Sequence, residues 1–119
     1  EVARLLGIPY AVVSSSRNTR PVLQAANLLD RFEVIVDGNT ADEKHLPGKP
    51  APDTYLYAAE RLGVPARQCA VFEDATAGVA AGRAGDFGLV VGVNRGSGAA
   101  SLQAAGADLV VDDLGETLV

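Results

Sequence analysis

Three short polar segments each lie at the end of an expected strand or loop, and their residue types suit phosphate chemistry. Residues 14–18, SSSRN, offer hydroxyls and an amide before an expected helix, whose free N–H groups favour anions. Lys49 follows on a loop that neighbouring prolines restrict. Glu73 and Asp74 end an apolar run and offer the hard oxygen ligands that Mg²⁺ prefers. Phosphoryl transfer requires this combination of phosphate donors, a fixed cation and a metal site.

Each segment also has a simpler structural interpretation. The serines could form a turn in which Asn18 caps the next helix. Lys49 could be a solvated loop lysine, and the acidic pair could place negative charge at a helix N-terminus. The functional interpretation rests on position, because ligands of open parallel sheets bind beyond the carboxyl ends of the strands.

The elements that must position these residues alternate along the chain. Short β-branched runs and small-residue helical stretches predict an α/β fold, with a Rossmann-like parallel sheet and crossover helices. Gly63 and Gly106 are expected to cap helices, and residues 39–50 to form a surface loop after a turn at 37–40. Expected strands are 10–13, 33–36, 70–72, 89–93 and 109–111, and expected helices are 2–6, 19–28, 52–62, 76–84 and 99–105.

Length and composition limit the class of protein. The 119 residues, 48% of them hydrophobic, suit a single domain. A net charge of −5 argues against a protein that binds nucleic acid, because such binding requires a broad basic face. The single cysteine, Cys69, cannot form an internal disulfide, and with its apolar neighbours it predicts a buried thiol and a cytoplasmic protein. No apolar run approaches the roughly 20 residues that cross a bilayer, so no membrane partner is expected. Because the chain starts at Glu1, we interpret its beginning as a cut end.

Three separated motifs resemble those of a known family, and they agree with them in order and spacing. Residues 12–18 (VVSSSRN), 48–53 (GKPAPD) and 71–78 (VFEDATAG) are similar to the second, third and fourth motifs of the haloacid dehalogenase superfamily. The resemblance covers nearly the whole chain and is strongest to the β-phosphoglucomutase-like group of sugar-phosphate phosphatases and mutases. It implies Mg²⁺-dependent phosphoryl transfer on a small phosphorylated sugar through an aspartyl-phosphate.

The resemblance also implies residue roles. Ser14 would hydrogen-bond the transferring phosphoryl group with help from Asn18, and Lys49 would orient the nucleophile and offset charge. The metal ligands would be Glu73 and Asp74. Ser16 and Arg17 match positions near the substrate phosphate.

One motif of the family is missing. Members carry Asp-x-Asp-Gly-Thr or Ser on a central strand, where the first aspartate is the nucleophile and the second the general acid and base. Residues 1–119 contain no such motif and no inserted cap, so we expect both in an upstream part of the same polypeptide. Residues 1–119 would then form the C-terminal part of an incomplete core, inactive alone. In the family the missing strand lies between the serine-motif and acidic-motif strands, so its loss would leave a gap or exposed apolar edges.

Other functions remain as alternatives. A non-catalytic phosphate-binding or interaction module would also lack the nucleophile. A phospho-acceptor receiver carries its acidic pair first, then its hydroxyl and then its lysine, whereas this chain has Ser14 first, then Lys49, then Glu73 and Asp74. A serine hydrolase would need a Gly-x-Ser-x-Gly elbow, which is absent, and the single His45 has no acid placed to complete a triad.

Overall fold

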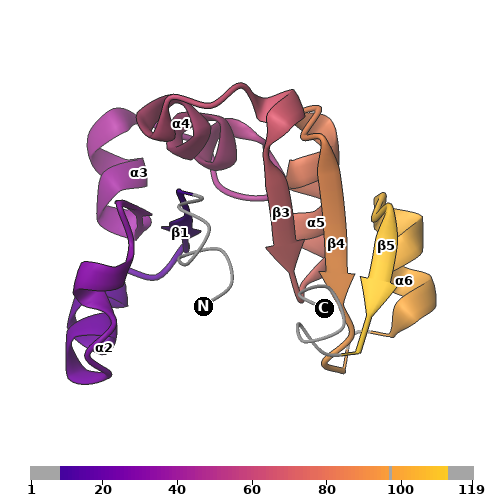
Figure 1. Cartoon of the computed structure of the whole chain (residues 1–119), viewed down its shortest axis with the longest axis horizontal. Coiled ribbons are helices and arrows are strands. Elements are labelled where there is room, and N and C mark those ends of the chain that lie inside the picture. The colour runs from indigo at the N-terminus through magenta and orange to yellow at the C-terminus, as the bar shows by residue number, and fades with distance from the viewer. Residues whose placement is uncertain (1–8, 97, 113–119) are drawn as a thin grey trace.

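A computed structural model describes residues 9–96 and 98–112, and it has the expected α/β architecture (Figure 1). The expected helix at 2–6 lies outside these residues. The elements in chain order are β1 (Ala11–Val13), α2 (Thr19–Ala25), the 3₁₀ helix η1 (Leu29–Arg31), β2 (Val34–Val36), α3 (Gly38–Lys44), α4 (Asp53–Leu62), the 3₁₀ helix η2 (Ala66–Gln68), β3 (Ala70–Glu73), α5 (Thr76–Ala84), β4 (Leu89–Val93), α6 (Ala99–Ala105) and β5 (Leu109–Val111).

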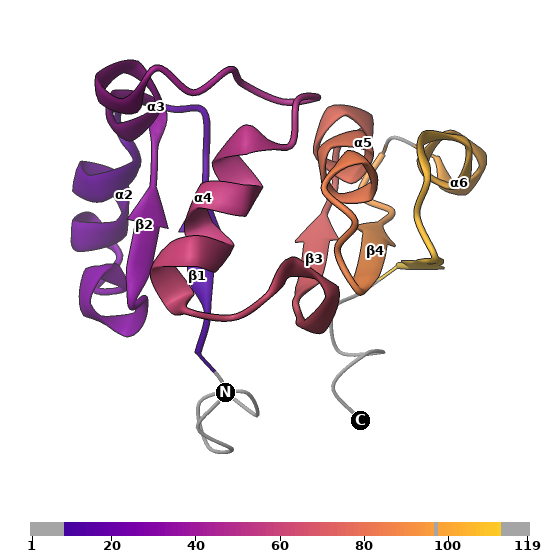
Figure 2. The ribbon, with the colours of Figure 1, turned by 90° about the horizontal axis from the view of Figure 1, so that it is seen from above.

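The strands form two separate parallel sheets. One pairs β1 with β2, with Val12 opposite Ile35, and the other has the order β3-β4-β5, with Phe72 opposite Val91. Strands β1 and β3 are therefore edge strands of different sheets, and α4 lies over the gap between them (Figures 1 and 2). This is the gap expected from a core that lacks one central strand, and the chain is a partial α/β domain.

The main core lies between the β3-β4-β5 sheet and helices α4, α5 and α6. Val79, Val90 and Leu102 are completely buried there. Small residues allow α5 to approach the sheet closely, since a Cβ placed on Gly82 would lie 3.2 Å from Cγ2 of Val90. Apolar burial of this kind is the main stabilising contribution to such a fold.

Two of the helices end at a glycine. Gly63 after α4 and Gly106 after α6 adopt left-handed backbone conformations, with φ of 74° and 117°. Their backbone N–H groups bond to carbonyls of the last helical turn, which satisfies groups that a helix leaves free. The predicted caps at both positions are confirmed.

The predicted surface loop at 39–50 is wrong in its first half, because helix α3 occupies Gly38–Lys44. Asp37 starts this helix: its carboxylate accepts a hydrogen bond from the backbone N–H of Thr40 at 2.9 Å, and the Thr40 hydroxyl accepts one from the Asp37 N–H. The expected turn at 37–40 is thus a reciprocal capping box. His45 ends α3 in a left-handed conformation, which gives this residue a structural position.

Other boundaries shift slightly. Helix α2 ends at Ala25 rather than at 28, since Asn27 takes a positive φ of 59° before η1. Asn18 occupies the N-cap position of α2, but its side chain makes no capping hydrogen bond. Within residues 9–96 and 98–112, no helix combines the length and apolarity needed to span a membrane.

Candidate functional site

The centre of the site is an ion pair that joins the two sheets. Lys49 Nζ donates hydrogen bonds to Oε2 of Glu73 at 2.9 Å and to the carbonyl of Val13 at 3.2 Å. Val13 is the last residue of β1 and Glu73 the last of β3, so the carboxyl ends of both edge strands meet at one side of the molecule. The Lys49 and Glu73 side chains are only 18% and 14% exposed, which limits screening of their attraction by water.

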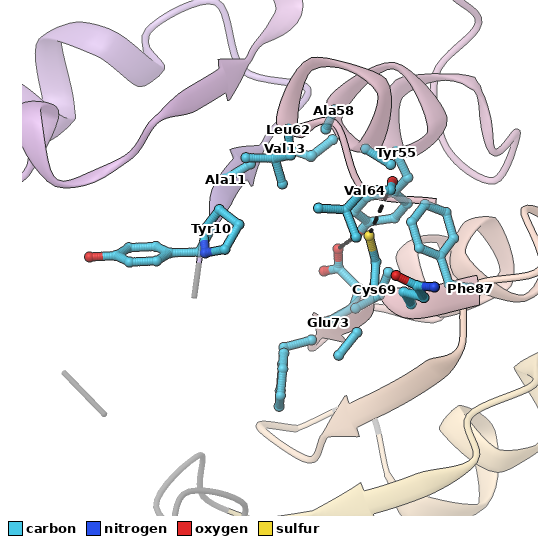
Figure 3. A pocket seen from close by; sticks show the side chains of 16 residues that line it. Tyr10, Ala11, Val13, Tyr55, Ala58, Leu62, Val64, Cys69, Glu73 and Phe87 are labelled. Carbon is cyan, nitrogen blue, oxygen red and sulfur yellow. Dashed lines mark hydrogen bonds between the residues drawn. The ribbon is translucent and has the colours of Figure 1, made fainter. Parts of the chain in front are cut away.

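A third residue, Tyr55 on α4, completes what we call the Lys49–Glu73–Tyr55 cluster. Its hydroxyl donates to Oε2 of Glu73 at 2.5 Å (Figure 3), and Lys49 Nζ lies 4.9 Å from the centre of its ring. The ring packs edge-on against Phe87 at 5.8 Å. The sequence pattern places Tyr55 only as an apolar residue at helical spacing and does not indicate this polar contact.

The cluster shifts two pKa values in opposite directions. Burial alone would raise the pKa of Glu73, but hydrogen bonds from Tyr55 and Lys49, together with the lysine charge, leave it below its ordinary value. Burial, followed by the bond to Glu73 and the charge of that carboxylate, raises the pKa of Tyr55. Glu73 is therefore a carboxylate and Tyr55 a neutral donor at neutral pH.

The neighbouring carboxylate, Asp74, belongs to an exposed residue at the same strand end. Its backbone N–H donates to Oε1 of Glu73 at 3.2 Å. The two carboxylates are hard oxygen donors of the type Mg²⁺ prefers. The described residues contain no group of three or more His, Cys, Asp or Glu side chains that could hold a metal. The pair therefore fits Mg²⁺ as part of a ligand set that water or further residues would complete.

The serine segment forms a tight turn after β1. The Ser14 hydroxyl accepts the backbone N–H of Ser16 at 3.2 Å, and the Ser16 hydroxyl accepts that of Asn18 at 3.0 Å. Ser16 and Asn18 are exposed and Ser14 is half-buried. The turn interpretation is thus correct for the backbone. Both serine hydroxyls act as acceptors here, and within residues 9–96 and 98–112 neither donates its proton to another group.

Arg17 turns towards α3 instead of the acidic pair. Its guanidinium contacts Asp42 at 2.7 Å, and both side chains are largely exposed. Arg17 nevertheless shares a cavity of about 170 Å³ with Ser14 and Lys49. Thr54, at the start of α4, lines the same cavity, and its buried Oγ1 has no hydrogen-bond partner among the described residues. The structure thus brings three of the predicted phosphate-site residues together and adds one hydroxyl that the sequence pattern did not indicate.

A larger cavity of about 440 Å³ lies in the gap between the sheets (Figure 3). Its lining is mostly apolar and includes Ala11 and Val13 of β1, Val71 and Phe72 of β3, and Tyr55 of α4. Phe72 is 44% exposed, although it lies in the middle of a strand. The cavity is therefore bounded by two strand edges that have no neighbouring strand within the described part of the chain.

The site can be compared with known proteins. A family model described as haloacid dehalogenase-like hydrolase matches residues 1–86. A β-phosphoglucomutase of Mycobacterium bovis is 57% identical over 122 residues, which cover 99% of this chain and 46% of that protein.

Solved structures agree with the sequence comparison. A hydrolase of the same family from Deinococcus radiodurans, with bound phosphate and sodium, has a TM-score of 0.83 at 34% identity, covering 98% of this chain and 52% of that one. A β-phosphoglucomutase from Clostridium difficile has a TM-score of 0.80 at 29% identity, covering 96% and 47%. The chain thus spans about half the length of these relatives. The shared fold and the extent of the family match show that this chain belongs to the haloacid dehalogenase-like hydrolases.

Proposed function

We propose that this chain is the C-terminal part of a Mg²⁺-dependent enzyme that transfers a phosphoryl group of a small sugar phosphate through an aspartyl-phosphate. The observation that supports this most directly is the Lys49 ammonium held between the carboxyl ends of β1 and β3, beside the acidic pair. A half-buried, fixed cation at a strand end stabilises the charge that develops on a transferring phosphoryl group. The similarity to a β-phosphoglucomutase makes a mutase our first choice, with a phosphatase as the variant that uses water as acceptor.

In this proposal the chain's own residues bind and orient the phosphoryl group. The Ser14 hydroxyl and the Asn18 amide donate to its oxygens, and Lys49 orients the nucleophile and balances charge. Ser16 and Arg17 contact the substrate phosphate; for Arg17 this requires release of Asp42, an exchange of low cost because the pair is exposed. Glu73 and Asp74 would hold Mg²⁺, which would supply positive charge against the phosphate oxygens.

The nucleophilic aspartate would come from a strand that fills the gap between β1 and β3. That position places a strand-terminal aspartate beside Lys49, Ser14 and the acidic pair, because the carboxyl ends of parallel strands align. We assign this strand, and the cap that selects the sugar, to polypeptide that precedes Glu1. The apolar lining of the 440 Å³ cavity suits the alternating side chains of such a strand.

The test uses the polypeptide extended by the coding sequence upstream of Glu1. With Mg²⁺ it is assayed for phosphate release and for interconversion of β-glucose 1-phosphate and glucose 6-phosphate. Lys49→Met is expected to reduce kcat by about 10²-fold or more, as loss of one charge-stabilising donor does. Lys44→Met is the matched control, since Lys44 is an exposed lysine in the last turn of α3.

The outcomes separate the candidate functions. Turnover that depends on Lys49 and not on Lys44 supports the enzyme. An extended protein without turnover and without an Asp-x-Asp motif would refute phosphoryl transfer and favour a non-catalytic phosphate-binding module. Isomerisation without net phosphate release identifies a mutase, and phosphate release without isomerisation identifies a phosphatase.

A further inference from the structure

The two oxygens of the Glu73 carboxylate have different surroundings. Oε2 accepts two hydrogen bonds from side chains, those of Tyr55 at 2.5 Å and Lys49 at 2.9 Å. Oε1 accepts the backbone N–H of its neighbour Asp74, at a longer 3.2 Å. Oε2 is therefore held by two side-chain donors, whereas Oε1 accepts a longer bond from a backbone N–H.

Core packing contributes to the position of the Tyr55 ring, independently of its bond to Glu73. The residue is 8% exposed, belongs to the main core cluster with Ala59 and Val79, and stacks edge-on with Phe87. The ring also faces the Lys49 ammonium at 4.9 Å, and the hydroxyl points at Glu73 (Figure 3). Lys49, by contrast, divides its protons between Glu73 and the Val13 carbonyl. Tyr55 thus directs its one hydroxyl proton to Glu73 alone, whereas Lys49 has a second acceptor.

We propose that Tyr55 is a positioning residue that holds Glu73 so that Oε1 alone is offered to Mg²⁺. This inference rests on the proposed function, since it assumes that the acidic pair binds the metal. Mg²⁺ requires a near-octahedral set of single oxygen ligands, whereas Ca²⁺ accepts carboxylates through both oxygens and tolerates irregular geometry. A glutamate that can offer only one of its oxygens to a metal therefore favours Mg²⁺ over Ca²⁺. Tyr55 therefore sets both the affinity for Mg²⁺ and the discrimination against Ca²⁺.

The experiment measures Mg²⁺ and Ca²⁺ binding by calorimetry for the extended polypeptide and for Tyr55→Phe, which keeps the ring and its contact with Phe87. Removing a group that orients a metal ligand typically costs about 10–100-fold in affinity, and we expect that loss for Mg²⁺. The affinity for Ca²⁺ should fall by less, so the ratio of the Ca²⁺ dissociation constant to the Mg²⁺ dissociation constant should decrease. Tyr57→Phe is the matched control, because it removes a hydroxyl from a half-buried tyrosine on the same helix.

The results separate positioning from a purely structural role. Equal Mg²⁺ affinity in Tyr55→Phe and the parent, or an equal loss for both ions, overturns the inference. A parent that binds no Mg²⁺ refutes the metal site of the proposed function as well, so the two failures are distinguishable.

A second measurement applies if Tyr55→Phe does not fold. The ¹³Cζ resonance of Tyr55 in the parent is followed during Mg²⁺ addition, with that of Tyr57 as internal reference. Metal on Oε1 withdraws charge from the carboxylate that Tyr55 donates to, so the Tyr55 resonance should move and that of Tyr57 should not. A Tyr55 resonance unchanged at saturating Mg²⁺ overturns the inference.

Discussion

Replacement of Gly78 by alanine provides a sharp test of how Glu73 is held. Gly78 is a buried residue in α5, and a Cβ built on it would overlap Cγ, Cδ and Oε2 of Glu73. The glutamate side chain lies directly against the helix backbone at this point. In Gly78→Ala it must rotate away and lose its bonds to Tyr55 and Lys49.

The size of the effect follows from the two hydrogen bonds that break. Each is a bond to a charged group, worth about 1.5–3 kcal/mol, in a setting where the carboxylate is 14% exposed. The higher helix propensity of alanine offsets about 1 kcal/mol of this loss in the free energy of unfolding. We therefore expect Gly78→Ala to lower the free energy of unfolding by about 2–5 kcal/mol.

The assay is urea denaturation of the extended polypeptide, with Gly82→Ala as control. Gly82 lies one turn further along α5, and a Cβ there would meet Val90 at 3.2 Å and Val71 at 3.4 Å, so it needs only small adjustments. If Gly78→Ala is as stable as Gly82→Ala, the described position of Glu73 is wrong. In a Glu73→Ala background the cost of Gly78→Ala should largely disappear, because the two residues share one interaction.

Three further predictions concern single side chains. Burial alone would raise the pKa of Asp37, but Thr40 and Arg20 hold that pKa below its ordinary 3.8, so the stabilising contribution of this carboxylate is present above about pH 4 and is lost as the pH falls through the lowered value. Asp37→Ala should therefore cost about 1–2 kcal/mol in urea denaturation at pH 7 and progressively less towards pH 2; an equal cost at both pH values would contradict this. Thr54→Val removes a buried hydroxyl that has no partner among the described residues, so thermal unfolding should show equal or higher stability, by up to about 1 kcal/mol; a clear loss would mean that the hydroxyl is hydrogen-bonded. Arg17→Ala should change stability by less than about 1 kcal/mol, because its pair with Asp42 is exposed, while raising KM for the sugar phosphate; an unchanged KM would remove Arg17 from the substrate site.

Features with a local cause were predictable from the sequence. The glycine caps of α4 and α6, the small-residue helix α5 and the strands β3, β4 and β5 depend on short patterns, and the structure confirms them. Helix α3 was missed because residues 39–44 are polar and precede several prolines. The available signal was Asp37 with Thr40 three positions later, a capping pattern that we interpreted as a turn.

Features that depend on residues far apart in the chain were harder to predict from the sequence. Lys49 and Glu73 were both predicted to act at the site, but their direct contact joins residues 24 positions apart. Tyr55 reaches Glu73 across 18 positions and satisfies the apolar spacing of α4, so nothing local distinguished it from an ordinary core aromatic. Pairing across a fold depends on how its layers pack, and a single sequence does not contain that information directly. The substrate roles of Ser14, Ser16, Arg17 and Asn18 stay predictions.

The gap between β1 and β3 has a consequence for the order of folding. These strands are separated in the chain by α2, β2, α3 and α4, and a strand placed between them from upstream would be synthesised before either neighbour. It could complete its pairing only after β3 had left the ribosome, which makes closure of the sheet a late step of high contact order. Until then its apolar faces would depend on chaperones or transient contacts for protection. Nascent chains stalled before and after β3 leaves the ribosomal exit tunnel should therefore differ sharply in protease resistance.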